Sequence, residues 1–598
     1  MRVKLQKTKY PFFLFLCVFF VLLPWIFFDV DVGDQAYSSV SSWLLAFQKR
    51  PLGTPELWYD TTPIWFSLFL NSLWWRLIGP EASLLAERLG WILLNASTAV
   101  ILFFTLRSYY EEKKVFLALF LTALLVNCAA DHFIITYNSA GPALGAISFA
   151  LFARTYSLSR HEPKILFALG SGFFAIVAIQ AKLPSLPFVG LFFFCSLVLE
   201  LRSSFKTVLL RFSALGAGLA LGILFALAAL YATNQWEMYF AGFKKFFTLV
   251  ASSSSNRRTE NTIVLLRVVG HYKKIALGTL FFGAMILAIS YAGKWKNIAL
   301  AAGLAIFAFL VTEKYGVALA MLLGAPLFLH SLKFWQEKKW PPIGKVIFLG
   351  GGLLVLAAFT FGTTLEGVQN FKYGLWIWFP FAYLETESFE FKWIDTKLTR
   401  RFLVAAACLL FLITRLQWPT FPYLERTIFS MRAPFQTRFL KGIFSYPEKQ
   451  AALDGLATEL NHLGVKEGDT LLAYAGAPPY YPTALVYPIT RTIPLFHNPC
   501  LIEYPGFNWP THREVLLALA AKNELPKIIV RQKIGFLGHP AGVKTFFLDI
   551  PAVTDEPFQW TTPEKNGLAG ELDTILQTHG YLPTWQNAHY VILERQGG

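Results

Sequence analysis

Residues 10–37 read YPFFLFLCVFFVLLPWIFFDVDVGDQAY. The part from Tyr10 to Phe28 is nearly all apolar and has the length that crossing a bilayer requires, about 20 residues. Three aspartates, Asp29, Asp31 and Asp34, follow at once. Carboxylates at a membrane boundary are costly to keep, so they usually mark a place where chemistry or transport occurs. The stretch therefore predicts a membrane protein that acts where its first helix leaves the bilayer.

The composition supports the same class across most of the chain. Of its 598 residues 55% are hydrophobic and only 15% are charged, and the mean hydropathy is +0.47. We predict a polytopic α-helical membrane protein with about thirteen transmembrane helices. The expected spans are 10–28, 84–106, 115–131, 136–153, 165–181, 186–200, 208–231, 275–292, 298–312, 316–332, 343–361, 374–390 and 402–418. The short apolar stretch 63–78 is left out, because its Trp74, Trp75 and Arg76 favour a helix lying in the interface.

The chain divides into two parts near residue 418. Residues 1–418 form the predicted transmembrane domain, in which residues 29–83 are a first outer loop with interfacial helices. Residues 1–418 carry 38 Lys and Arg against 21 Asp and Glu, whereas residues 419–598 carry 15 Lys and Arg against 16 Asp and Glu. The tail, 419–598, alternates short helical and strand-like patterns and is predicted to be an α/β soluble domain. Its expected helices are 448–463 and 513–521, and its expected strands are 470–474, 527–531 and 589–594.

The distribution of Lys and Arg sets the expected orientation. The basic clusters 107–114, 154–164 and 333–345 fall on the same side as the amino terminus, and the positive-inside rule places that side in the cytoplasm. The first segment has acidic residues where a signal peptide would have its cleavage site, so it is read as a retained helix. We expect a multi-pass protein of the inner (plasma) membrane, with the carboxy-terminal domain in the periplasm or another extracytoplasmic space. Nucleic acid is not expected as a partner.

Cofactor motifs are absent from the sequence. Four of the five cysteines lie in predicted spans, so the tail can form neither a disulfide framework nor a cysteine metal cluster. No P-loop, Rossmann glycine pattern or zinc spacing is present. We predict no cofactor and assign no metal ligands.

The first outer loop carries the most specific pattern. Asp34-Gln35-Ala36-Tyr37 follows the exit of the first helix, and Pro55, Tyr59, Asp60 and Pro63 come later in the loop. The pattern resembles that of the GT-C class of membrane glycosyltransferases, in particular the branch of protein O-mannosyltransferases and lipid A aminoarabinose transferases. The resemblance covers most of residues 1–420. It implies a GT-C-like fold and transfer of a monosaccharide from a polyprenyl-phosphate donor to an extracytoplasmic lipid, glycan or protein.

The resemblance also assigns roles to acidic and polar residues. Asp34 matches the catalytic aspartate, and Gln35 stands where the family usually has Glu. Asp131 or Asn138, near the end of the third span, would orient the acceptor or the sugar, together with Asp31 and Tyr37. The simpler alternatives are that the aspartates only solvate the helix exit, which applies more to Asp29 and Asp31 than to Asp34, and that Asp131 caps a helix.

Five cations are candidates for binding the lipid phosphate. Lys182, in Ala181-Lys182-Leu183-Pro184, resembles the Thr-Lys-Gly-Pro-like ending common in the class, although a terminal lysine can also simply reach the interface. Arg267 and Lys273 belong to a basic region on the side predicted to be outside. Lys314 and Lys372 resemble a late Lys/Arg-x-Tyr feature. A cation near the bilayer surface suits a phosphate ligand.

Two other classes of function remain open. A lipid-linked glycan transporter or flippase would use the same cations to line a passage and would need no base, but should place ionisable residues near the middle of several helices. A non-catalytic assembly protein would use its tail to bind a partner.

Overall fold

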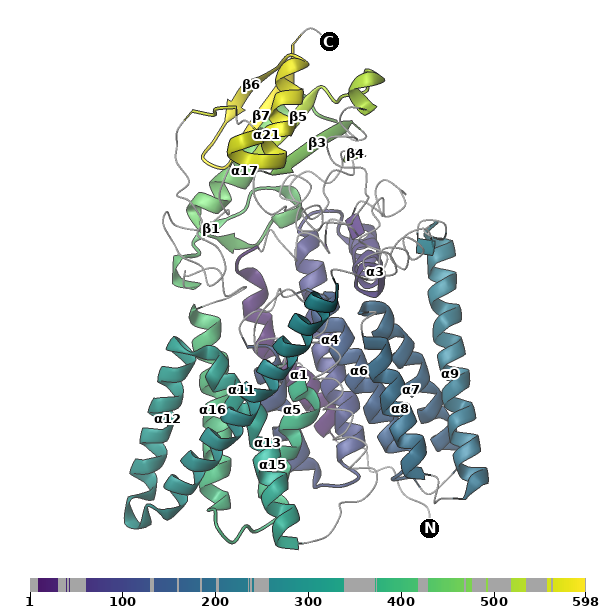
Figure 1. Cartoon of the computed structure of the whole chain (residues 1–598), viewed down its shortest axis with the longest axis vertical. Helices are drawn as coiled ribbons and strands as arrows, with labels where there is room; N and C mark the ends of the chain where they lie inside the picture. Colours follow the sequence, from purple (N-terminus) through teal and green to yellow (C-terminus); the bar gives the residue numbers. More distant parts are fainter. Residues whose placement is uncertain are drawn as a thin grey trace.

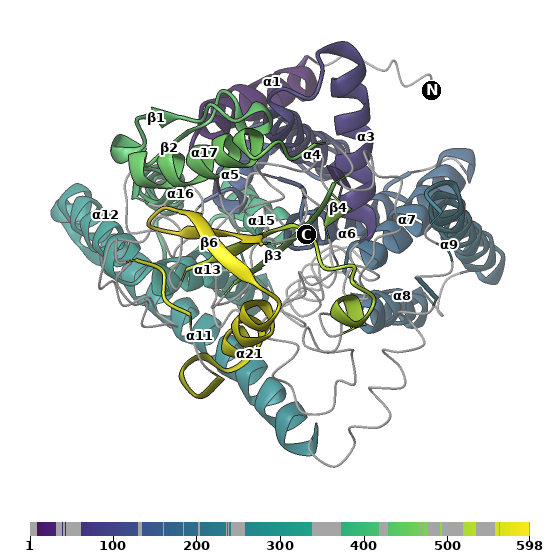
Figure 2. The ribbon, with the colours of Figure 1, turned by 90° about the horizontal axis from the view of Figure 1, so that it is seen from above.

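The computed structural model describes residues 9–30, 39, 42–43, 61–128, 134–158, 161–182, 185–200, 204–234, 236, 239–240, 257–337, 372, 374–417, 428–466, 469–475, 491–492, 518–533, 557–560 and 563–596. Long helices form a bundle, and a smaller part with a β-sheet lies at one end of it (Figure 1). Figure 2 shows this carboxy-terminal part over the helices. We name that end of the bundle the tail-facing end.

Apolar helices build the bundle. They coincide with predicted spans, except that α3 (Thr61–Leu77) corresponds to the stretch 63–78, which was left out of the spans, and that the span 343–361 lies outside the described residues. The first span is α1 followed by a short 3-10 helix, η1, which begins next to Pro24. The helices are α1 (Tyr10–Leu22), η1 (Leu23–Phe27), α3 (Thr61–Leu77), α4 (Ser83–Leu106), α5 (Glu112–Val126), α6 (Tyr137–Arg154), α7 (His161–Ala181), α8 (Leu186–Glu200), α9 (Phe205–Ala232), α11 (Arg257–Tyr291), η4 (Gly293–Trp295), α12 (Lys296–Glu313), α13 (Tyr315–Glu337), α15 (Leu375–Ser388) and α16 (Thr396–Gln417).

Seven helical stretches among the described residues are long and apolar enough to cross a membrane. They make this a multi-pass membrane protein by length and composition, while the count of thirteen spans stays a prediction. The seven are Tyr10–Phe27, Ser83–Leu106, Lys164–Ala181, Phe205–Ala232, Tyr272–Tyr291, Gly293–Glu313 and Tyr315–Glu337.

Glycines allow two helix pairs to approach closely. A Cβ atom added to Gly218 of α9 would lie 2.0 Å from the carbonyl oxygen of Leu169 in α7, and one added to Gly172 would lie 2.2 Å from that of Leu215. Gly278 of α11 lies in the same way against the backbone of α13. Small residues at helix contacts suit a membrane protein, because packing rather than exclusion of water holds its helices together.

The tail is built around a five-stranded sheet with the order β4-β3-β5-β7-β6. β3 pairs in parallel with β4 and β5, whereas β7 is antiparallel to both β5 and β6. Its elements are α17 (Pro447–His462), β3 (Thr470–Ala475), β4 (Arg491–Thr492), β5 (Ile528–Gln532), α21 (Pro563–Thr578), β6 (Tyr581–Gln586) and β7 (Tyr590–Arg595). The predictions for α17, β3, β5 and β7 are confirmed, and residues 518–521 of the predicted helix 513–521 are helical. The sequence analysis missed α21, β4 and β6.

The two faces of this sheet pack against different helices. Along β7, Tyr590 and Ile592 belong to the apolar cluster that contains Leu453 and Leu456 of α17. The intervening Val591 and Leu593 belong to the cluster of Leu572 and Leu576 of α21. Successive side chains of a strand point to opposite faces, so α17 covers one face and α21 the other.

A small two-stranded sheet links the tail to the bundle. It consists of β1 (Ala433–Pro434) and β2 (Phe444–Ser445) and is accompanied by the 3-10 helices η6 (Ile428–Ser430) and η7 (Arg438–Leu440). The apolar cluster under α17 continues into the bundle part, since it also contains Val30, Trp43 and Leu84. The tail therefore docks on the exit of the first span and on the start of α4.

Candidate active site at the tail-facing end

The predicted catalytic segment lies between two described anchors. Asp31, Asp34 and Tyr37 fall within residues 31–38, which are outside the described residues, as is Asp131. Val30 and Ser39, which flank the segment, are both fully buried. The described geometry on either side of the segment is therefore that of these two anchors.

Asp29 forms the first anchor. Its backbone is left-handed, with φ of 55°, a conformation that aspartate tolerates better than most residues. The backbone N–H donates to the carbonyl oxygen of Phe444 (2.7 Å), while the carboxylate oxygen Oδ1 accepts the N–H of Val30 (2.8 Å). The side chain is fully buried, so the expectation that Asp29 mainly solvates a helix exit is corrected.

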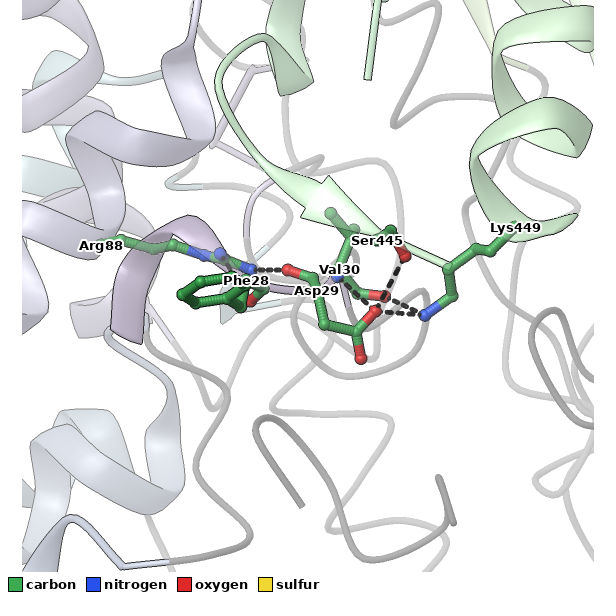
Figure 3. A network of polar contacts seen from close by, with 6 residues as sticks. All are labelled: Phe28, Asp29, Val30, Arg88, Ser445 and Lys449. Carbon is green, nitrogen blue, oxygen red and sulfur yellow. Dashed lines mark hydrogen bonds and ion pairs between the residues drawn. The ribbon is translucent and has the colours of Figure 1, made fainter. Parts of the chain in front are cut away.

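Two side chains of the tail also contact Asp29 (Figure 3). Ser445 of β2 donates its hydroxyl to Oδ1 (3.2 Å). Lys449, in the first turn of α17, donates to the same oxygen (2.8 Å) and to the carbonyl oxygen of Val30 (2.6 Å). The ammonium is as buried as the carboxylate, and a buried charge is tolerated only when it is paired and hydrogen-bonded.

Arg88 holds the same turn from the bundle side (Figure 3). Its guanidinium donates to the carbonyl oxygens of Ile26, Phe28 and Asp29. Arg88 is the sixth residue of α4 and is fully buried. Carbonyl groups at the end of a helix lack intrahelical partners, and here the guanidinium of Arg88 donates the hydrogen bonds that they need.

Glu87 forms the second anchor. Its carboxylate accepts hydrogen bonds from the hydroxyl groups of Ser39 and Ser42 and from the side-chain amide of Asn71 in α3. All four side chains are buried. Two consecutive residues of α4 thus hold the chain on either side of residues 31–38, Arg88 at Asp29 and Glu87 at Ser39.

A second polar group gathers at the end of α5. Lys372 donates its ammonium to the carbonyl oxygen of Cys128 (3.2 Å), and Arg415 of α16 donates to that of Asn127. Both cations are buried. The two cations donate hydrogen bonds to carbonyl groups at the carboxy-terminal, negative end of the α5 dipole. These carbonyls belong to the residues three and four positions before Asp131 in the chain.

Two neutral contacts tie this group to other helices. The hydroxyl of Tyr315, the first residue of α13, pairs with the thiol of Cys128 (3.1 Å). Asn127 donates to the side-chain oxygen of Asn95 in α4 (3.1 Å). Asn95 follows Arg88 by seven residues, which places it about 10 Å further along α4 at 1.5 Å per residue. The two polar groups therefore lie at different depths along one helix.

The other predicted phosphate ligands belong to separate helices. Lys182 directly follows α7 and is buried, and its N–H closes the last turn on Ala178 (3.1 Å). Lys314 is exposed and directly precedes Tyr315, whose hydroxyl contacts Cys128 after the end of α5. Lys372 contacts the same cysteine, so the chain positions of both lysines lie near the end of α5. Lys273 is exposed on α11. Arg267 in α11 and Asn138 in α6 lie in described helices, but their side chains are outside the description.

Sequence reasoning missed Lys449, Glu87 and Arg415. Arg415 had a usable signal, since a single cation near the end of an apolar span is costly and usually has a role. Lys449 had none, because it reads as one of several charges in an ordinary amphipathic helix. Its partner Asp29 lies 420 positions earlier.

The described residues hold no group of three or more His, Cys, Asp or Glu side chains that could bind a metal ion. No protein-family model and no curated protein sequence matches the chain. A crystal structure of the oligosaccharyltransferase of Archaeoglobus fulgidus, in complex with zinc and sulfate, is similar to it over 88% of this chain and 68% of its own, at 11% identity and a TM-score of 0.46. A likeness this loose assigns neither a fold family nor an activity, so the residues at the tail-facing end carry the functional argument.

Proposed function

We propose that this protein is a membrane glycosyltransferase of the GT-C class, which transfers a monosaccharide from a polyprenyl-phosphate-linked donor to an extracytoplasmic lipid, glycan or protein. The observation that carries the proposal is the anchoring of the residues on either side of 31–38. Arg88 and Lys449 hold Asp29 directly before the acidic segment, and Glu87 holds Ser39 directly after it. A general base must be held precisely, and buried anchors on both sides of the segment support this role for Asp34.

The proposed reaction inverts the anomeric carbon. An acceptor hydroxyl attacks this carbon, and the carboxylate of Asp34 takes the hydroxyl proton. The bond between the anomeric carbon and the phosphate oxygen breaks, and the polyprenyl phosphate leaves with the electron pair. Cations near the leaving oxygen stabilise its charge. The candidates are Lys182, Arg267, Lys273, Lys314 and Lys372, while Asp131, Asn138, Asp31 and Tyr37 would orient acceptor or sugar.

The location of buried charge favours an enzyme over a flippase. In the described helices of the bundle, buried charged side chains such as Glu87, Glu200, Arg211 and Glu385 lie within about two turns of a helix end. A passage through the bilayer would require ionisable groups near the helix centres. The proposal needs no cofactor, because the donor arrives already activated.

Replacement of Asp34 tests the mechanism. Membranes that contain the natural chain are supplied with a radiolabelled polyprenyl-phosphate sugar, and label is followed into lipid, glycan and protein fractions. Asp34→Asn should lower the transfer rate about 10²- to 10⁴-fold, the usual contribution of a general base. The labelled fraction identifies the class of acceptor.

The matched control is Asp31→Asn, which removes a carboxylate from the same acidic run. It should keep a rate well above that of Asp34→Asn, since an orienting group contributes less than the base. Full activity of Asp34→Asn would exclude this residue as the base. If neither the natural chain nor the variants transfer label from any sugar donor tried, the glycosyltransferase proposal is rejected.

A further inference from the structure

Among the described residues, two ion pairs of very different character join the tail to the first outer loop. Lys449 binds Asp29 with both side chains buried. Lys441 binds Glu81 (2.8 Å) with both side chains largely exposed, and its hydrogen bond and charge hold the pKa of Glu81 below the usual value. Exposed pairs contribute little to stability. Of the two ion pairs, the buried one can therefore constrain the loop, beside the backbone bond from Asp29 to Phe444.

Lys449 is held firmly on the tail side. It lies in the first turn of α17, whose Leu453 and Leu456 pack into the apolar cluster beneath the β-sheet. Its ammonium reaches the carboxylate of Asp29 and the carbonyl oxygen of Val30. The next residue in the chain is Asp31. Packed and hydrogen-bonded contacts therefore connect the sheet of the tail, through Lys449, to the residue directly before the acidic segment.

We propose that Lys449 is a positioning residue for sugar transfer, because it fixes Asp29 and Val30, the two residues directly before the segment that carries Asp34. The inference rests on the proposed function. Lys449 acts through the backbone of the loop, and the tail thereby becomes part of the catalytic machinery.

The kinetic test compares two full-length variants. In Lys449→Met a side chain of similar length loses its charge at the buried contact, and in the control Lys441→Met the same change removes the exposed pair. Displacement of a catalytic group by about 1 Å can cost 10²-fold in rate. We expect Lys449→Met to lower kcat 10- to 100-fold with little change in the KM for the lipid-linked donor, and Lys441→Met to match the natural chain.

A second pair of variants separates positioning from misfolding. Lys449→Met leaves the carboxylate of Asp29 buried without its cation, which is itself destabilising. Asp29→Asn with Lys449→Met removes both charges and should restore a monodisperse, thermally stable protein. If the lysine positions the loop, the double variant keeps the low kcat. Recovery of kcat in the double variant would overturn the inference.

A covalent link supplies a rescue. Phe28 and Phe444 pair as an isolated parallel bridge, so their Cα atoms are about 5 Å apart, within the range that a disulfide spans. Phe28→Cys and Phe444→Cys are added to Lys449→Met, and diamide oxidises the two thiols to a disulfide. Oxidation should restore most of the lost kcat, and dithiothreitol should remove it again. A disulfide confirmed by peptide mapping that restores nothing would contradict positioning by the tail.

Hydrogen exchange tests the anchor independently of catalysis. Backbone amides of residues 29–43 should exchange faster in Lys449→Met than in Lys441→Met or the natural chain. If natural membranes transfer no sugar, the proposed function fails, while faster exchange still supports the anchor. If transfer proceeds normally in Lys449→Met and exchange is unchanged, the inference fails and the proposed function stands.

Discussion

Arg88 is the residue on which the exit of the first span depends. One guanidinium satisfies three carbonyl groups, those of Ile26, Phe28 and Asp29. Its planar fork of donors suits this arrangement, whereas the ammonium of lysine is a point charge on a flexible stem. The left-handed turn at Asp29 is thus held from two sides, by Arg88 at the backbone and by Lys449 at the side chain.

We predict that Arg88→Lys destabilises the protein although the charge is kept. Each buried hydrogen bond from a charged donor that is not replaced costs on the order of 1.5–3 kcal/mol. The melting temperature in detergent should fall by several degrees, as measured by fluorescence on the purified protein. The matched control is Arg432→Lys, because Arg432 is exposed and donates only to the carbonyl oxygen of Phe429. Equal melting temperatures of the two variants would contradict the role of Arg88.

Single residues also mark the limit of what the sequence could predict. The cost of burying charge directed attention to the aspartates behind the first span, of which only Asp29 is described. The same reasoning treated Asp29 as solvated, because its cation lies 420 positions away in another part of the chain. The roles of Asp34 and Asp131 stay predictions, since both lie outside the described residues.

At the scale of elements, helix predictions succeeded where the signal is local. A run of about 20 apolar residues determines a spanning helix without reference to the rest of the chain, and α4, α7 and α9 lie where their runs predicted. β6 was missed because its side chains are mostly exposed and Pro583 interrupts the strand pattern. α21 was missed because its Leu572 and Leu576 are buried against residues of other elements, such as Ile529 of β5 and Val591 of β7, and the local sequence does not show that packing.

The close packing of α7 against α9 gives a second prediction. Gly218→Ala places a methyl group against the backbone of Leu169 and should lower the melting temperature clearly. Gly216 lies on the same helix, and a Cβ atom there meets nothing within 4 Å. Gly216→Ala should leave stability unchanged or raise it by up to about 1 kcal/mol, the helix preference for Ala over Gly. Thermal unfolding of the two variants decides the matter, and an equal fall in both would show that the close contact is not responsible.

At the scale of the whole molecule, the distribution of basic residues predicts the orientation. A cysteine at Thr578, exposed at the end of α21, should react with a membrane-impermeant maleimide in intact spheroplasts. A cysteine at the exposed Glu111, in the basic loop before α5, should react only after permeabilisation. Both variants are made with Cys500→Ser, which removes the cysteine of the tail. The reverse labelling pattern would show that the tail is cytoplasmic and would move the proposed reaction to the other leaflet.

The anchor between Asp29 and Lys449 also has a consequence for biosynthesis. Ribosomes make the first span and its acidic exit early, but they reach position 449 only after α16, the last helix of the bundle, has been completed. A nascent chain can therefore insert its helices while the aspartate still lacks its cation. If the tail positions the segment as proposed, activity depends on the final quarter of translation, and a chain that ends before position 449 would insert in the membrane without transferring sugar.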